Sequence, residues 1–558
     1  MATISEALAI AIQHHQAGRL QAAEQIYRQI LQVEPNHPDA IHLLGMIAYQ
    51  AGKHAAAVEY IRRAIGLRGT SATFHNNLGN VLMDQGKRDE AVACYRRALE
   101  LKPDYAAAHS NLGNAFWDQG KLDEAVACYR RALELKPDYA EAHSNLGNVL
   151  KDQGKLDEAV ACYRRALDLK PDYAEAYNNL GAALKDQGKL DEAVTCYRRA
   201  LELKSGYADA HNNLGVALVS QGKLNEAVAC YSRVLELDPE RAEARLNRSF
   251  LWLLTGDFEH GWPEYEWRWR TKQISPRPFQ QPLWDGSSLA GKTILLHAEQ
   301  GLGDAIQFVR YAPLVKQLGG TIIVECQQPM LPLLATCPGI DRLVGQGGEL
   351  PAFTTHAPLL SVPGILKTSL DTIPASVPYL FAARALVESW REKLRGVSGF
   401  KIGINWQGRA GQGSWLARNI PLQQFAALAA IPGVRLISLQ KGSGREELTQ
   451  ERERFPVLDP GNEVDQESGA FMDTAAIMMN LDLVITSDTA IPHLAGALGV
   501  PVWLALPFAP DWRWLLDRTD SPWYPTMRLF RQQERDNWHG VFEQIEKALR
   551  QQLESACR

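Results

Sequence analysis

Apolar and polar positions between residues 1 and 275 follow a helical spacing that starts again with a period of 34. Each unit holds two stretches in which small and apolar residues recur every three or four positions, a pattern typical of amphipathic helices. A glycine that permits a turn follows the first stretch of each unit, at Gly18, Gly52, Gly86, Gly120, Gly154, Gly188, Gly222 and Gly256. The pattern predicts seven full helical pairs and a divergent eighth, which bury their apolar faces by stacking on one another.

A different pattern begins after residue 290, where short apolar stretches alternate with helical ones. The predicted strands cover residues 293–297, 321–325, 342–344 and 358–361, then 400–406, 434–439 and parts of 483–507. A helix is predicted from Ala305 to about Gln317, and the last helix from Val541 to Leu553. Strands that alternate with helices form parallel sheets. We therefore expect two Rossmann-like α/β lobes, at roughly 290–390 and 398–535, with a cleft between them.

The stretch 483–503 contains the most prominent candidate site of the second lobe. It reads as an apolar strand, a polar turn, a helix of small residues and a second strand that begins at Val500. Ligands of parallel α/β sheets bind at the carboxyl ends of the strands. The helix after Thr489 opens with unpaired N–H groups and the positive end of its dipole. An anionic group such as a nucleotide diphosphate is therefore expected at this turn.

Length and composition limit the class of protein. A chain of 558 residues is long enough for about three to four domains. Its formal net charge of −5 is small and does not indicate a nucleic-acid partner. The amino terminus lacks a basic region followed by an apolar core, and no apolar run approaches the length of a membrane span. We expect a soluble, cytoplasmic protein with no membrane span and no nucleic-acid partner.

The repeating unit resembles the tetratricopeptide repeat. In residues 106–137 the resemblance rests on Gly113, Ala125, Tyr129 and Pro137, together with the small residues between them. It implies a superhelical solenoid whose concave surface binds an extended peptide or another protein.

One polar position repeats with the helices, at Asn77, Asn111, Asn145, Asn179, Asn213 and Asn247. A side-chain amide donates and accepts at once, so a column of amides is suited to holding a peptide backbone. The alternative is that each asparagine bonds to its neighbouring repeat. The column resembles the asparagine ladder of the protein O-GlcNAc transferases. Four histidines that also recur with the repeats are interpreted as structural, namely His75, His109, His143 and His211.

Two motifs in the second half resemble the heptosyltransferase type of GT-B glycosyltransferase. These are Gly301-Leu302-Gly303-Asp304 and, much further along the chain, the segment from Asp488 to Leu494. The resemblance covers roughly residues 290–545, and repeats joined to a GT-B half are also similar in architecture to the protein O-GlcNAc transferases. The expected fold is an all-α tetratricopeptide-repeat superhelix (1–275) followed by an α/β GT-B fold, with an amino-terminal acceptor lobe (276–395) and a carboxy-terminal nucleotide-sugar lobe (396–558).

The resemblance implies roles for matching residues. Asp304 matches the base that removes a proton from the acceptor hydroxyl; its alternative role is the N-cap of a helix that begins at Ala305. Gly303, Asp488, Thr489 and His493 match the donor-binding residues. Asp488 is alternatively an N-cap and His493 a packed histidine. Where this chain has Ala490 the family has glycine, which affects how closely the backbone approaches the sugar phosphate.

A diphosphate leaving group needs positive charge near it. Arg409, Arg418 and Lys441 follow the first two strands of the second lobe and are candidates to supply that charge, or else they are solvated loop cations. The sequence contains no Asp-x-Asp motif. We therefore expect no metal and no other cofactor, with the nucleotide-sugar serving as substrate.

The function expected from these features is that of a metal-independent protein O-glycosyltransferase. Its repeats would capture a protein acceptor, such as a flagellin or another surface protein, and its GT-B half would transfer a sugar to a side-chain hydroxyl. UDP-GlcNAc is the expected donor, by analogy with the repeat-bearing relatives. Two alternatives stay open: a non-catalytic interaction scaffold with a nucleotide-binding domain, and a transferase that acts on a glycan or lipopolysaccharide acceptor.

Overall fold

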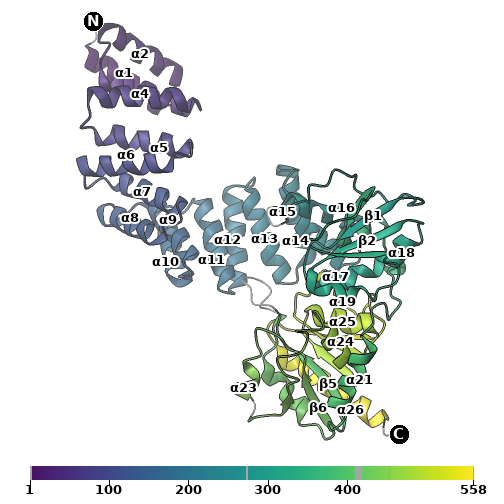
Figure 1. Cartoon of the computed structure of the whole chain (residues 1–558). Coiled ribbons are helices and arrows are strands. Elements are labelled where there is room, and N and C mark those ends of the chain that lie inside the picture. Colours follow the sequence, from purple (N-terminus) through teal and green to yellow (C-terminus); the bar gives the residue numbers. More distant parts are fainter. Residues whose placement is uncertain (1–2, 272–273, 409–417, 452, 557–558) are drawn as a thin grey trace. The chain divides into compact units, whose positions relative to one another are not determined.

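The computed structural model describes residues 3–271, 274–408, 418–451 and 453–556. Contacts between Cα atoms divide the chain into two compact units, residues 1–221 and 222–558. The first unit is a series of antiparallel helical pairs, drawn from purple to blue in Figure 1. Its helices are α1 (Ile4–Gln16), α2 (Leu20–Val33), α3 (Pro38–Gln50), α4 (His54–Leu67), α5 (Ala72–Asp84), α6 (Arg88–Leu101), α7 (Ala106–Asp118), α8 (Leu122–Leu135), α9 (Ala140–Asp152), α10 (Leu156–Leu169), α11 (Ala174–Asp186), α12 (Leu190–Leu203) and α13 (Ala208–Ser220).

Glycines allow the helices of a pair to approach each other. A Cβ placed on Gly113 of α7 would lie 2.9 Å from a ring carbon of Tyr129 on α8, so any larger residue would push the two helices apart. Gly120, in the turn between them, has a φ of 73°, which side-chain-bearing residues rarely adopt. The predicted helical pairs are therefore confirmed, and the glycine positions explain how they pack.

The second unit begins with α14 (Leu224–Leu237), α15 (Ala242–Leu254), α16 (Phe258–Tyr265) and the 3-10 turn η1 (Glu266–Arg270). These helical elements therefore belong to the same compact unit as the sheets. The strands that follow are β1 (Thr293–His297), β2 (Thr321–Cys326), β3 (Arg342–Gly345), β4 (Thr355–Pro358), β5 (Phe400–Asn405), β6 (Val434–Ser438), β7 (Val457–Leu458), β8 (Leu483–Thr486), β9 (Val502–Leu506) and β10 (Met527–Arg531).

Both sheets are parallel, as the sequence predicts. The first has the strand order β3-β2-β1-β4 and the second β10-β9-β8-β5-β6-β7. Numbered within its lobe and read from β7, the second sheet has the order 3-2-1-4-5-6, which is that of the doubly wound α/β fold. In such a sheet a ligand binds where the strand order reverses, which here is between the carboxyl ends of β5 and β8.

Helices and 3-10 turns follow the strands and cover the sheets (Figure 1). They are α17 (Leu302–Phe308), η2 (Val309–Tyr311), α18 (Ala312–Lys316), η3 (Gln328–Met330), α19 (Leu331–Leu334), η4 (Leu359–Ser361), α20 (Val362–Ile365), η5 (Leu370–Thr372), α21 (Arg384–Lys393), η7 (Leu422–Phe425), α22 (Ala426–Ala429), α23 (Glu447–Glu451), α24 (Met472–Met478), α25 (Ala490–Leu498), η8 (Trp512–Trp514) and α26 (Trp538–Ala556). Within the described ranges, none of the helices combines the length and the apolar character that crossing a bilayer requires.

Three predicted elements differ from the structure. The fourth strand covers Thr355–Pro358 instead of 358–361, because the chain turns into η4 directly after Pro358. The single helix predicted to begin at Ala305 is broken into α17, η2 and α18, and Pro313 near the start of α18 cannot donate a backbone hydrogen bond to the preceding turn. The last helix is longer than predicted and extends from Trp538 to Ala556.

The end of the helical segment is packed against both lobes. The Trp262 ring of α16 meets the Trp512 ring of the second lobe edge to face, with centroids 5.4 Å apart. Its indole N–H donates to the carbonyl of Thr368 in the first lobe at 2.9 Å. One apolar cluster joins α16 and the first sheet to one face of the second sheet. The aromatic residues at the end of the helical segment thus pack it against both lobes.

Candidate functional site

Asp304 lies in the first turn of α17, directly beyond the carboxyl end of β1. Its Oδ2 accepts the backbone N–H of Gly301 at 2.9 Å. Gly301 is therefore the N-cap, and α17 begins at Leu302. The alternative that Asp304 caps a helix beginning at Ala305 is wrong, because the helix starts three residues earlier and Asp304 is its third residue.

The turn between β8 and α25 lies at the switch point of the second sheet. Thr489 caps α25 by accepting the N–H of Ile491 on its hydroxyl at 3.2 Å. The same hydroxyl donates to Oδ1 of Asn405, the last residue of β5, at 2.9 Å. Asp488 is not the cap, contrary to one alternative, and its side chain is buried beside the turn.

His493 is packed inside α25. Its Nδ1 lies 3.0 Å from the Tyr524 hydroxyl, and its ring stacks on Trp514 with centroids 5.2 Å apart. Burial lowers the pKa of His493 well below its ordinary value, so the imidazole is neutral at physiological pH. This geometry agrees with the packed-histidine alternative, and donor binding by His493 stays a prediction.

The two motifs meet where α17 packs against α25. A Cβ on Gly303 would lie 3.3 Å from the Cα of Ala490 and 3.2 Å from Cδ2 of His493. Gly303 thus permits close contact between the two motifs, in addition to any role in donor binding. The methyl group of Ala490, where the similar family has glycine, occupies part of the space that Gly303 leaves.

Arg513 links the two motifs, a role that is not predicted from the sequence. Its Nη2 donates to Oδ1 of Asp304 at 2.5 Å, its Nε to Oε1 of Gln307 at 2.7 Å, and its Nη1 to Oδ1 of Asp511 at 2.9 Å. Residues 510–514 stand out in the sequence for their aromatic side chains. An arginine between two tryptophans was the available signal, but nothing in the sequence indicates its partner 209 positions away.

Burial controls the charge of the carboxylates at this site. It raises the pKa of Asp304 above its ordinary value, and Arg513 opposes that effect. Burial also raises the pKa of Asp488 to about 7, reinforced by the negative charge of Asp511. Both effects favour the protonated form of the Asp488 carboxyl group. Burial likewise raises the pKa of Glu299, in the loop between β1 and α17, to about 7.

The predicted cations occupy different places. Arg418 lies next to the turn, with Nη1 4.0 Å from Oδ2 of Asp488. Lys441 follows β6, where its ammonium donates to Oδ2 of Asp465 at 2.8 Å and to the carbonyl of Val464. Arg409 lies outside the described residues. Of the three candidates, only Arg418 is shown beside the Asp488 turn.

Lys441 lines a cavity of about 510 Å³ at the carboxyl end of β6. Gln440, also in its lining, accepts a hydrogen bond from Nδ2 of Asn405 at 2.8 Å. Because Asn405 also accepts the hydroxyl of Thr489, the cavity is joined to the α25 turn through two side chains. Its volume falls within the range of small-molecule sites.

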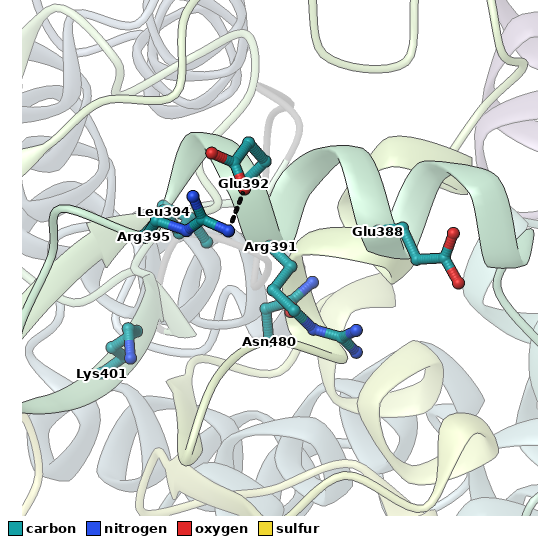
Figure 2. Close-up of a pocket in the computed structure, with 7 residues that line it drawn as sticks. All are labelled: Glu388, Arg391, Glu392, Leu394, Arg395, Lys401 and Asn480. Carbon is teal, nitrogen blue, oxygen red and sulfur yellow. Dashed lines mark ion pairs between the residues drawn. The ribbon is translucent and has the colours of Figure 1, made fainter.

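A second cavity, of about 350 Å³, lies near the amino ends of the strands of the same sheet. Figure 2 shows its lining, which combines α21 with Lys401 near the start of β5. The exposed ion pair between Arg395 and Glu392, 2.9 Å long, lies at its rim. Since ligands of parallel sheets bind at the carboxyl ends of strands, we do not assign this cavity to the candidate site.

Five asparagines of the repeating column donate a hydrogen bond to the preceding repeat. Asn145, for example, donates from Nδ2 to Oδ1 of Asn114 at 3.1 Å. Asn77, Asn111, Asn179 and Asn213 make equivalent bonds, to His42, Asn76 and Asn80, Asn148, and Asn178. Asn247 lies on α15 in the second unit. The alternative of bonding between repeats is therefore realised. Each such bond takes one of the two N–H groups of an amide, so bonding between repeats and holding a peptide do not exclude each other.

The four repeat histidines have the structural role that the sequence predicts. Nε2 of His109 lies 3.0 Å from the carbonyl of Pro103 in the preceding loop. His75, His143 and His211 make the same contact at 3.0–3.1 Å. Each histidine thus ties the start of its helix to the loop before it.

Family models match the amino-terminal part of the chain. A model described as TPR repeat matches residues 79–120, 113–154, 147–188 and 183–222, and one described as tetratricopeptide repeat matches 208–241. A model of subunit 3 of the anaphase-promoting complex, or cyclosome, matches residues 16–98. Tetratricopeptide repeats are therefore present, as predicted. Repeats of this kind imply a protein or peptide partner.

The chain is also similar to individual proteins. It is 27% identical to Protein FlbA of Caulobacter vibrioides over 329 residues, which cover 54% of each chain. The chain thus spans about half the length of this curated relative. Among solved structures, it resembles YrrB, described as a TPR protein with an unusual peptide-binding site (27% identity, 34% of this chain, 96% of that chain, TM-score 0.29). It also resembles MamA (26% identity, 30% of this chain, 97% of that chain, TM-score 0.28).

Proposed function

We propose that this chain is a glycosyltransferase of the GT-B type, which moves a sugar from a nucleotide-sugar to a hydroxyl group of a protein. One observation carries the proposal. Two motifs that lie far apart in the sequence meet where α17 contacts α25, with Asp304 on one side and the turn at Asp488 on the other. Each motif follows the carboxyl end of a strand in its own parallel sheet, which is where ligands of such sheets bind.

The donor side is supported by three features of the second lobe. The nine-residue helix α25 directs its first N–H groups toward the turn, and such a helix start attracts a diphosphate. Arg418 adds a positive charge beside Asp488. The cavity beyond Gln440 is large enough for a nucleoside. UDP-GlcNAc remains our proposed donor, by resemblance alone.

The acceptor side is supported by Asp304 and by the repeats. In the proposed reaction Asp304 takes the proton of the acceptor hydroxyl, whose oxygen attacks the anomeric carbon of the sugar. The bond between that carbon and the diphosphate oxygen breaks, and the diphosphate leaves with the electron pair. The repeats would hold the protein that carries this hydroxyl. Metal independence remains part of the proposal, because the sequence has no Asp-x-Asp motif.

A screen of nucleotide-sugars by thermal shift and by nucleotide release tests the donor half of the proposal. We expect one donor to raise the melting temperature of the wild type and to be hydrolysed slowly. Asp304→Ala should keep the thermal shift and lower hydrolysis by about 100-fold or more, since general-base catalysis contributes 10²–10⁴-fold. Asp371→Ala, at an exposed carboxylate of the same lobe, is the matched control. No response to any donor would favour the interaction scaffold.

The acceptor is tested by mass spectrometry of proteins co-expressed with the wild type and with Asp304→Ala. A protein that gains the sugar mass only with the wild type supports a protein acceptor. Hydrolysis of a donor without any modified protein would instead indicate a glycan or lipopolysaccharide acceptor, because the catalytic half would then be active on a different substrate.

A further inference from the structure

Arg513 is fixed by groups from both lobes. Asp304 and Gln307, which accept from its Nη2 and Nε, belong to α17 of the first lobe. Asp511, which accepts from Nη1, belongs to the second lobe, as does Arg513 itself. The guanidinium therefore bridges the lobes at the position of the proposed base.

The side chain has little freedom to move. Its guanidinium carbon lies 4.5 Å from the centroid of the Trp512 ring and 5.5 Å from that of Phe308. Only 9% of the Arg513 side chain is exposed. A planar guanidinium that is held by three acceptors and packed against two aromatic rings keeps a single orientation. Arg513 consequently fixes the orientation of the carboxylate that it contacts.

Arg513 is also the cation in direct contact with Asp304. The other charged or titratable groups near this carboxylate are Asp511 and Arg418 from the second lobe, Glu299 from its own lobe and Tyr265 from the end of the helical segment. Asp511 and Glu299 disfavour a negative charge on Asp304, as does burial. The ion pair with Arg513 is the principal opposing influence.

We propose that Arg513 is a positioning residue that keeps Asp304 ionised and oriented for proton transfer. This inference rests on the proposed function. Oδ1 of Asp304 is held by Arg513 and Oδ2 by the N–H of Gly301, and each oxygen retains a lone pair for a further hydrogen bond. The acceptor hydroxyl gives its proton to one of these oxygens. Because Arg513 and Asp304 come from different lobes, the base has this orientation only when the lobes are in contact.

The test is the pH dependence of kcat/KM for hydrolysis of the donor identified in the screen. Arg513→Met removes the positive charge, so Asp304 should hold its proton to higher pH. The acidic limb of the profile should move upward by about 1–3 pH units, the usual effect of an opposite charge at this distance. Arg513→Lys keeps the charge but loses the planar fork, so it should leave the limb near its original pH and lower kcat by about 10- to 100-fold.

For a second variant, which keeps Arg513 in place, we expect the acidic limb to shift in the opposite direction. Asp511→Asn removes a negative charge that raises the pKa of Asp304, so the acidic limb should move to lower pH. Arg518→Met is the control, because Arg518 forms an exposed ion pair with Asp520 in the same segment; its profile should match the wild type. All variants are first compared by circular dichroism and thermal denaturation.

The outcomes separate the two proposals. If the wild type hydrolyses no donor, the proposed function is wrong and this inference falls with it. If the wild type is active and folded Arg513→Met shows an unmoved limb, the proposed function stands and the role of Arg513 is only structural. The same conclusion follows if Arg513→Met does not fold and Asp511→Asn leaves the limb unmoved.

Discussion

Gly303 and Ala490 approach so closely that a Cβ on Gly303 would lie only 3.3 Å from the Cα of Ala490. These residues belong to different lobes and are separated by 187 positions in the sequence. Their contact brings the first turn of α17, which carries Asp304, against the turn that carries Asp488. The close packing of two helix starts is thus the physical basis of the candidate site.

A larger residue at Gly303 should separate the two helices. Gly303→Val places methyl groups against backbone that cannot move freely, and we expect it to lower the free energy of unfolding by about 1–3 kcal/mol. Urea denaturation measures this effect. Gly396→Ala is the control, since no atom lies within 4 Å of a Cβ at that position. Equal stability of the two variants would show that the lobes do not depend on this contact.

Two tyrosines of the repeats provide a matched pair. The Tyr163 hydroxyl donates to Oδ1 of Asn148 at 2.7 Å. The equivalent hydroxyl of Tyr197 is buried without a hydrogen bond among the described residues, because Ala182 replaces the asparagine there. Tyr163→Phe should cost about 0.5–1.5 kcal/mol of stability, whereas Tyr197→Phe should be neutral or stabilising. Thermal denaturation of both variants tests this, and an equal cost would contradict it.

The asparagine column is tested by combined replacement of Asn145, Asn179 and Asn213 with alanine. If the column holds the acceptor, KM for the protein acceptor should rise while hydrolysis of the donor alone stays unchanged. Thermal denaturation must accompany the assay, because each replacement also removes a bond between repeats. Loss of stability with an unchanged acceptor KM would limit the column to its structural role.

Two histidines on neighbouring strands of the first sheet, His297 on β1 and His356 on β4, should make stability depend on pH. Nε2 of His297 lies 3.3 Å from Nδ1 of His356. Burial lowers the pKa of His297 to about 3 and lowers that of His356 as well. Folded pKa values below the unfolded value of about 6.5 mean that the stability is fully present above pH 6.5 and is lost as the pH falls toward 3.

His297→Leu should reduce this dependence. Each proton taken up on unfolding contributes about 1.4 kcal/mol per pH unit to the loss of stability. The melting temperature of the variant should therefore fall less steeply than that of the wild type between pH 6.5 and 4. Carboxylates that also titrate in this range affect both proteins equally, so the difference isolates His297. Parallel curves would show that His297 is not buried in its neutral form.

The sequence predicted the repeats well because their signal is local. Helical periodicity, a turn glycine such as Gly120 and the constant spacing between equivalent positions can all be read from one unit and its neighbour. The parallel strands were also predictable, since a buried strand is a short apolar run between helices. The boundary of β4 was placed three residues too late, because an apolar run continues through Leu359 and Leu360 although the backbone has already turned into η4.

The same distinction between local and long-range information applies to the candidate site. The sequence alone determined the repeats, the alternation of strands and helices, and the two motifs that contain Asp304 and Asp488, because each depends on neighbouring residues. Only the tertiary structure decided that Arg513 contacts Asp304 and that Gly303 lies against Ala490. Such contacts join residues that are far apart in the sequence and leave no periodic trace in the chain. They arise from the way the two sheets and the helices between them pack into one core.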